Sequence, residues 1–321
     1  MSTVTILGAG AFGTALAVAL ARGGAAVTLW TRDPDQATRL SAARQNRDRL
    51  PGVDLPESVS VTAEIGTIPA EGPVLLALPM QQLAGFLAAQ PGLDGRVLVA
   101  CCKGIDLATL EGPASVIRRT CASATPAILT GPSFAADIAR GMPTALTLAC
   151  ADVARGEALQ RGLSTPVLRL YRTTDVTGAE LGGALKNVIA IAAGVVIGAG
   201  FGDSARAALM TRGYAEMTRM AEALGARAET LAGLSGFGDL VLTCTSSQSR
   251  NFRFGEALGR RGTFDPAVTV EGAATARAVA KLAAQRGFEM PITRMIAALL
   301  DRETSIEEAA ESLLTRPLKQ E

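Results

Sequence analysis

Short apolar runs alternate with helical patterns through the first half of the chain. Apolar runs of this length are typical of buried parallel strands, and the stretches between them have the spacing of helices. The predicted strands lie at 4–7, 26–30, 74–78, 96–100, 127–130, 144–148 and 167–171, with helices at 14–22 and 81–89. After about residue 176 the strand patterns stop, and helices are predicted at 180–200, 205–224, 251–259, 271–286, 292–300 and 305–314. This order predicts an α/β N-terminal domain over residues 1–178 and an all-α C-terminal domain over residues 179–321.

The apolar stretch at residues 180–200 is predicted to be a helix buried in the middle of the protein. It is apolar on nearly every face apart from Lys186 and Asn187, as expected of a helix inside a protein or a membrane. Its uncharged part, residues 188–202, has 15 residues and several glycines, which is short for a membrane span. A buried ammonium must be paired or have a lowered pKa, which suits proton transfer, so Lys186 is a candidate catalytic residue. The alternative is a lysine whose ammonium reaches the surface.

Composition excludes several classes of protein and of site. Hydrophobic residues make up 48% and charged residues 19% of the 321 residues, which indicates a globular protein. The net charge of +1, without arginine runs interleaved with aromatics, argues against a nucleic-acid partner. The absence of histidine excludes Ser-His-Asp and Cys-His catalysis and histidine metal sites, and we expect no metal centre. Five cysteines and a strand pattern at the very start predict a cytoplasmic protein with reduced thiols and no signal peptide.

A glycine motif follows the first predicted strand. The motif G-x-G-x-x-G occupies residues 8–13, directly before the predicted helix, and a second strand follows that helix. Gly8 suits a tight turn, Gly10 lets the backbone approach a pyrophosphate, and Gly13 lets the helix pack closely on the strand. The pyrophosphate is expected to rest on the helix N-terminus. In this context the motif predicts a Rossmann-type dinucleotide-binding domain.

The end of the second predicted strand indicates which dinucleotide binds. An acidic residue there bonds the ribose 2′-hydroxyl of NAD, whereas an arginine accommodates the 2′-phosphate of NADP. The first charged residue is Arg32, so we expect NADP or NAD as cofactor, with NADPH slightly favoured. The alternative is that Arg32 pairs with Asp33 or Asp35 at the start of a helix.

Two candidate site residues follow predicted strands. Lys103 comes after the strand at 96–100, and Ser133 follows Gly131 after the strand at 127–130. Ligands of open α/β sheets bind at the carboxyl ends of the strands, so both side chains are candidates for the site. The alternative for the turn around Gly131 and Ser133 is an ordinary helix-capping turn.

The helical half contains two further candidate groups. Asp239 lies in a glycine-rich turn and is suited to orient or pair with a buried lysine. Ser249, Arg250 and Asn251 precede a predicted helix, and a guanidinium and amides beside a helix N-terminus suit an anion such as a phosphate. The alternative is a capped surface helix with a solvated arginine.

These motifs occur together in one known family. In chain order they are residues 8–13, 102–104, 131–135, 181–190, 236–240, 249–251, 270–272 and 290–292. With them at this spacing, the sequence resembles bacterial NAD(P)-dependent glycerol-3-phosphate dehydrogenase over essentially its whole length. The resemblance implies a fold like that of 6-phosphogluconate dehydrogenase. It also implies the reversible reduction of dihydroxyacetone phosphate to sn-glycerol 3-phosphate, which feeds glycerophospholipid synthesis.

The resemblance implies roles for single residues. Lys186 matches the general acid/base that protonates the carbonyl oxygen as hydride arrives from the nicotinamide, and Lys103 and Asp239 are the other candidate catalytic residues. The matching substrate contacts are Lys103, Gly131, Ser133, Lys186, Asp239, Ser249, Arg250 and Asn251. The matching cofactor contacts are Gly8, Gly10, Ala11, Phe12, Gly13, Arg32, Lys103, Ala135, Arg250, Val270 and Glu271.

Two positions depart from the family pattern. Ala11 stands where a Ser or Thr hydroxyl is common, so one polar contact to the cofactor phosphates is lost, and Met80 stands where a serine is usual. A 3-hydroxyacid dehydrogenase is the competing enzyme, and a non-catalytic dinucleotide-binding sensor is the competing non-enzyme. The candidates Lys103, Lys186 and Asp239 together argue against a sensor. We expect a homodimer that acts on a small molecule and has no membrane span.

Overall fold

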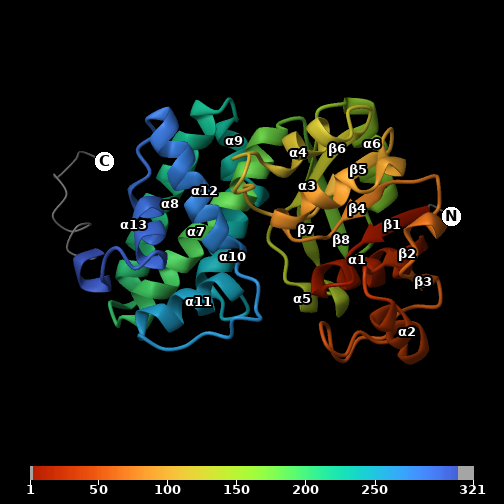
Figure 1. Cartoon of the computed structure of the whole chain (residues 1–321), viewed down its shortest axis with the longest axis horizontal. Coiled ribbons are helices and arrows are strands. Elements are labelled where there is room, and N and C mark those ends of the chain that lie inside the picture. Colours follow the sequence, from red (N-terminus) through yellow and green to blue (C-terminus); the bar gives the residue numbers. More distant parts are fainter. Residues whose placement is uncertain (1–2, 310–321) are drawn as a thin grey trace.

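Eight strands form a single sheet in the N-terminal half of the chain (Figure 1). The computed structural model describes residues 3–309. In spatial order the strands are β3 (Val59–Thr62), β2 (Ala26–Trp30), β1 (Thr3–Leu7), β4 (Val74–Leu76), β5 (Val97–Ala100), β6 (Thr125–Thr130), β7 (Thr144–Cys150) and β8 (Leu168–Thr173). Neighbouring strands are parallel except β6 and β7, which are antiparallel. The strand order reverses between β1 and β4, which is the position where dinucleotides bind in sheets of this type.

Helices cover both faces of this sheet. One apolar core contains Leu16, Ile138 and Leu159 from three helices on the same side, which are α1 (Ala11–Arg22), α5 (Ala135–Ala139) and α6 (Val153–Leu163). A second core contains Leu83 and Ile117 from two helices on the other side, which are α3 (Met80–Ala88) and α4 (Pro113–Thr120). Because both faces are covered, a central strand such as β4 is buried along its whole length, which explains its continuous apolar run.

Helix α7 (Val176–Gly198) runs through the middle of the helical half, as Figure 1 shows. The helices around it are α8 (Gly202–Ala223), α9 (Ala228–Ala232), α10 (Asp239–Thr245), α11 (Arg250–Gly259), α12 (Glu271–Arg286) and α13 (Pro291–Leu300). Among the described residues α7 is the one helix long and apolar enough to cross a membrane by length and composition, yet 83% of its most apolar window is buried inside the structure. The prediction of a buried central helix is therefore confirmed, and so is the fold class of a Rossmann-type domain followed by a helical one.

Several element boundaries differ from the predictions. Helix α7 begins at Val176 rather than Glu180, because the Asp175 side chain accepts a hydrogen bond from the Gly178 N–H at 2.8 Å and caps the helix four residues earlier. The proposed division between residues 178 and 179 falls in this first helical turn. The predicted helix at 305–314 lies partly outside the described residues.

Some elements were not predicted at all. The edge strand β3 and the helix α2 (Pro34–Ala43) are examples, and both have few buried side chains. Elements at the edge of a domain bury little apolar surface, so their sequences carry weak periodicity. The helices α4, α5, α6, α9 and α10 were also missed.

Helices α7 and α11 cross at very close range. A Cβ atom on Gly194 would lie 2.1 Å from the Phe252 carbonyl oxygen, and one on Gly255 would lie 2.0 Å from the Ile191 carbonyl oxygen. Only glycine allows this approach from either side. The crossing holds the N-terminus of α11 beside the middle of α7, where the candidate site residues lie.

Candidate active site

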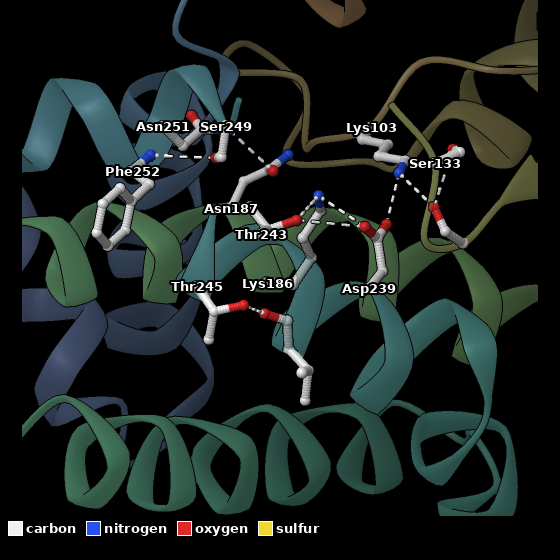
Figure 2. A network of polar contacts seen from close by, with 12 residues as sticks. Lys103, Ser133, Lys186, Asn187, Asp239, Thr243, Thr245, Ser249, Asn251 and Phe252 are labelled. Atoms are coloured by element: carbon white, nitrogen blue, oxygen red, sulfur yellow. Dashed lines mark hydrogen bonds and ion pairs between the residues drawn. The ribbon is translucent and has the colours of Figure 1, made fainter. Parts of the chain in front are cut away.

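Lys186 is buried beside a carboxylate that also binds Lys103. The Lys186 Nζ atom lies 3.0 Å from Asp239 Oδ1, and the Lys103 Nζ atom lies 2.5 Å from Asp239 Oδ2. Lys186 also donates a hydrogen bond to Thr243 Oγ1 at 2.6 Å, and that hydroxyl donates to Asp239 Oδ1 at 3.3 Å. Figure 2 shows the Lys186 ammonium between Thr243 and Asp239, with Lys103 approaching the carboxylate from the other side. The ammonium does not reach the surface, since the residue is only 6% exposed.

The charges of this cluster are strongly coupled. The pKa of Lys186 is lowered to about 8, mainly by burial and also by Lys103, while the Asp239 carboxylate acts in the opposite sense. Burial by itself would raise the pKa of Asp239, but the two lysines outweigh burial and hold that pKa below its ordinary value. At neutral pH the carboxylate is therefore ionised, and Lys186 carries a proton that it releases more readily than a solvated lysine does, because its pKa is about 8.

A glycine-rich turn brings Asp239 to Lys186. The turn is a π-helical segment, Leu234–Gly238, that leads directly into α10. A Cβ atom on Gly236 would lie 2.0 Å from the Leu231 carbonyl oxygen, and one on Gly182 of α7 would lie 2.7 Å from the Ser235 carbonyl oxygen. Glycine at both positions lets the turn press against α7. Single π-helical turns of this kind are frequent at functional sites.

Lys103 and Ser133 meet at the carboxyl ends of β5 and β6. The Gly131 carbonyl oxygen accepts a hydrogen bond from Lys103 Nζ at 3.2 Å and another from Ser133 Oγ at 3.1 Å. Gly131 has a φ of 136°, a conformation that L-residues with a side chain rarely adopt. The structure thus brings three of the predicted substrate contacts together beside Asp239.

The three residues predicted to bind a phosphate, Ser249, Arg250 and Asn251, lie at the start of α11. Ser249 is buried and its hydroxyl caps the helix by accepting from the Phe252 N–H at 3.2 Å, as in the capped-helix alternative, but the helix also packs closely on α7. Asn251 donates to Asn187 Oδ1 on α7 at 2.9 Å and accepts from the Gly272 N–H at 3.0 Å, so it links α7, α11 and α12. Arg250 is exposed at the first position of the helix, so its guanidinium is accessible to a ligand.

The glycine motif has the shape of a dinucleotide cradle. Gly8 has a φ of 119° and a Cβ atom there would lie 2.4 Å from the Ala77 carbonyl oxygen, while a Cβ atom on Gly13 would lie 2.0 Å from the Gly8 carbonyl oxygen. A Cβ atom on Gly10, in contrast, would meet no atom within 4 Å. Gly10 faces open space at the N-terminus of α1, whose N-cap makes no side-chain hydrogen bond and whose first turn has no acidic residue. The free N–H groups at this helix end fit a pyrophosphate.

The remaining predicted cofactor contacts lie around the same edge of the sheet. Arg32 is exposed and donates to Gln82 Oε1 at 3.3 Å, and the described residues show no ion pair from it to Asp33 or Asp35. The carboxylate of Glu271 accepts from the backbone N–H groups of Met80 and Lys103; burial raises its pKa, while Arg250 and these hydrogen bonds oppose the rise. Ala11 and Phe12 open α1, Ala135 opens α5, and Val270 is the N-cap of α12.

Two residues of the cluster were not singled out from the sequence. Thr243 orders the Lys186 ammonium, and Asn187 holds Asn251. Thr243 lies four residues after Asp239 on a helix, a spacing that puts both side chains on one face. That spacing was the available signal, but it was hidden because α10 itself was not predicted.

Comparison with known proteins agrees with this geometry. The family model for the N-terminus of NAD-dependent glycerol-3-phosphate dehydrogenase matches residues 3–155, and the model for its C-terminus matches residues 175–311. A relative named glycerol-3-phosphate dehydrogenase, NAD(P)+, from Cereibacter sphaeroides is 65% identical over 319 residues, covering 99% of this chain and 100% of that protein. A relative of the same name from Ruegeria sp. is 62% identical over 320 residues, with the same coverage.

A solved structure shows the same fold. Glycerol-3-phosphate dehydrogenase from Coxiella burnetii superimposes with a TM-score of 0.92 at 34% sequence identity, covering 98% of this chain and 99% of that one. Both family models and relatives above 60% identity over the whole length agree with it. The chain therefore belongs to the NAD-dependent glycerol-3-phosphate dehydrogenase family.

Proposed function

We propose that this chain is an oxidoreductase that reduces dihydroxyacetone phosphate to sn-glycerol 3-phosphate with NADH or NADPH, and that it also catalyses the reverse oxidation. Relatives named for this activity support the reaction. The observation that carries the proposal is the buried Lys186, held by Asp239 and Thr243 at the edge of the dinucleotide-binding sheet.

The direct test is substrate preference in the oxidative direction. The purified protein should reduce NAD⁺ or NADP⁺ with glycerol 3-phosphate and should fail with 3-hydroxyisobutyrate, the substrate type of the competing 3-hydroxyacid dehydrogenases. Turnover of the hydroxyacid alone would contradict the proposal. Tight cofactor binding without any turnover would favour the non-catalytic sensor instead.

Lys186 is the proposed proton donor of the reduction. The nicotinamide, when bound, supplies the hydride. Two of the three N–H groups of Lys186 are directed to Thr243 and Asp239, which leaves the third for the carbonyl oxygen of the substrate. A pKa of about 8 places the proton close to the working pH, where general acid/base catalysis is most effective. In the oxidation, the neutral amine accepts the hydroxyl proton at the same Nζ atom.

The substrate phosphate is proposed to bind at the N-terminus of α11. The exposed guanidinium of Arg250 and the first-turn N–H groups there provide positive charge and donors for a phosphate. Lys103, Gly131, Ser133, Asp239, Ser249 and Asn251 are the other proposed substrate contacts. Binding energy from the phosphate then orients the reacting carbonyl beside Lys186.

Arg250→Ala is expected to lower kcat/KM for dihydroxyacetone phosphate by roughly 10- to 150-fold, which corresponds to about 1.5–3 kcal/mol for a hydrogen bond to a charged group. Arg250→Lys should already impair the enzyme, because an ammonium cannot form the planar bidentate contact. Steady-state kinetics with each variant measures the effect.

Dihydroxyacetone, which lacks the phosphate, is the control substrate for Arg250. The wild type and the alanine variant should use it equally poorly, since neither gains from a phosphate contact. The Kd for NADPH is measured in parallel, because Arg250 is also a proposed cofactor contact. Equal losses on both ketones with NADPH binding intact would exclude a phosphate-binding role.

Arg32→Asp is expected to weaken NADPH far more than NADH, because the new carboxylate repels the 2′-phosphate and accepts from the ribose 2′-hydroxyl of NADH. Arg32 donates to Gln82, and we expect the loss of this contact to affect both cofactors alike. The ratio of kcat/KM for NADPH to that for NADH is the measurement. A ratio that stays unchanged would show that Arg32 does not read the 2′-phosphate.

The wider role follows from the reaction. We infer that the product enters glycerophospholipid synthesis and that the protein acts in the cytoplasm as a homodimer. Depleting the protein should lower the pool of newly made glycerophospholipid and should be corrected by supplied glycerol 3-phosphate. Light scattering after gel filtration should give twice the chain mass of 32.9 kDa.

A further inference from the structure

The N-terminus of α4, in the dinucleotide-binding domain, is capped by a side chain from α7. The N-cap residue of α4, Gly112, makes no side-chain hydrogen bond. Instead, Glu180 Oε2 on α7 accepts a hydrogen bond from the Ala114 N–H at 2.7 Å. A Cβ atom on Gly112 would lie 1.9 Å from Glu180 Oε1, so a side chain at residue 112 would displace the carboxylate.

The capped helix end is connected to Lys103 by a compact segment, residues 104–112. The Asp106 N–H donates to the Glu111 carbonyl oxygen at 2.9 Å, and Asp106 Oδ1 accepts from the Thr109 N–H at 2.8 Å. Because the segment is closed by its own hydrogen bonds, we expect a displacement of Ala114 to shift Lys103 as well.

Carboxylates of the helical half hold both ends of this stretch of chain, and Glu271 of α12 also accepts from the Lys103 N–H. Asp239 binds the Lys103 ammonium, and Glu180 binds the N-terminus of α4. Glu180 precedes Lys186 by six residues on the same helix, which is about 9 Å along the axis. The two contacts together fix the segment relative to the proposed proton donor.

We propose that Glu180 is a positioning residue for the reaction. Its ionised carboxylate holds the chain from Lys103 to Ala114 at a fixed position relative to Lys186. The proposal rests on the proposed function, because it assigns Glu180 an action through the two lysines. Glu180 itself is six residues from Lys186 and is not proposed to touch the substrate.

The charge of Glu180 responds to pH near neutrality. Burial raises its pKa to about 7, while the Ala114 N–H and Arg118 lower it and Glu111 raises it; the Cys102 thiol also lies near enough to interact with its charge. A carboxyl group that gains a proton accepts a weaker hydrogen bond from a helix N-terminus. The hydrogen bond from the Ala114 N–H to Glu180 is consequently strongest above pH 7 and weakens as the pH falls through this value.

The experiment compares Glu180→Gln with the wild type across the pH range. Glutamine keeps the shape and cannot ionise, so the variant resembles the protonated wild type at every pH. Misplacement of a catalytic group by as little as 1 Å can cost about 100-fold in rate, and we expect a loss on the order of tenfold from the weakened tie. The ratio of kcat/KM, variant to wild type, should be about 0.1 at pH 8 and rise toward 1 at pH 6.

The ratio removes two other sources of pH dependence. The second ionisation of the substrate phosphate, with a pKa of about 6, is the same for both enzymes. The titration of Lys186 is also common to both, and it controls the alkaline side of the profile. A ratio that does not change between pH 6 and pH 8, with an active wild type, would overturn the positioning role of Glu180.

Glu216→Gln is the matched control. The Glu216 carboxylate on α8 also caps a helix from a distance, accepting from the Ile292 and Thr293 N–H groups of α13 at 2.9 Å, and burial raises its pKa. Its contacts lie wholly within the helical half, so its ratio should stay constant with pH even if the variant is less stable. A pH-dependent ratio in this control would show that loss of any buried cap explains the effect, and would overturn the proposal.

No turnover of dihydroxyacetone phosphate by the wild type at any pH would instead overturn the proposed function, and the role of Glu180 with it.

Discussion

Lys186→Ala is expected to fold and to lose about 100- to 10,000-fold in kcat, the range for removal of a positioned general acid. Alanine is well suited to the interior of α7, and Asp239 keeps Lys103 as a partner after the change. Circular dichroism should show an intact helical protein, and kcat at saturating dihydroxyacetone phosphate and NADPH measures the loss.

Lys281→Ala is the control for this variant. Lys281 is an exposed lysine on α12, and its loss should leave kcat unchanged. Because the pKa of Lys186 is about 8, the wild-type reduction rate is expected to fall above pH 8 as Lys186 gives up its proton, and Lys186→Ala should lose this pH dependence. Near-wild-type kcat in the Lys186 variant would remove this lysine from the mechanism.

Asp239→Asn should have the second largest effect, because it removes the negative charge that two lysines share. The Asp239 charge opposes the lowering of the Lys186 pKa, so its loss lets burial and Lys103 lower that pKa below about 8. The alkaline limb of the reduction should therefore move to lower pH, and kcat at pH 8 should fall by about 100-fold or more. Breaking a buried ion pair in this way also destabilises a protein by about 3–5 kcal/mol.

Two measurements separate these effects of Asp239→Asn. Urea unfolding gives the loss of stability, and the pH profile of kcat gives the position of the alkaline limb. A variant that is less stable, but whose kcat still falls near pH 8, would show that Asp239 stabilises the fold without changing the pKa of Lys186. A matched change at the exposed Asp301, which pairs with Arg277 at the surface, should alter neither measurement.

The architecture could be predicted because it depends on patterns that are local in the chain. Parallel strands buried on both faces, such as β4 and β5, leave continuous apolar runs, and the turn after β1 must contain glycine at 8 and 13 for steric reasons. A lysine in an otherwise apolar helix can also be recognised from the sequence as a candidate site residue. Burial of an unpaired ammonium is so unfavourable that a function or a partner is required. Asp239 was suggested from the sequence as a partner for a buried lysine, but that Lys186 and Lys103 share it was not.

Tertiary structure alone decided how the candidate residues combine. Asp239 lies 136 residues after Lys103 and 53 after Lys186, and it contacts both only because α7 and the turn before α10 pack on the edge of the sheet. The same packing places the Glu180 carboxylate on the N-terminus of α4, 66 residues earlier in the chain. Local spacing reports on neighbours along a helix or strand, whereas these contacts join elements distant in the chain, and their energy depends on burial that exists only after the two halves have packed.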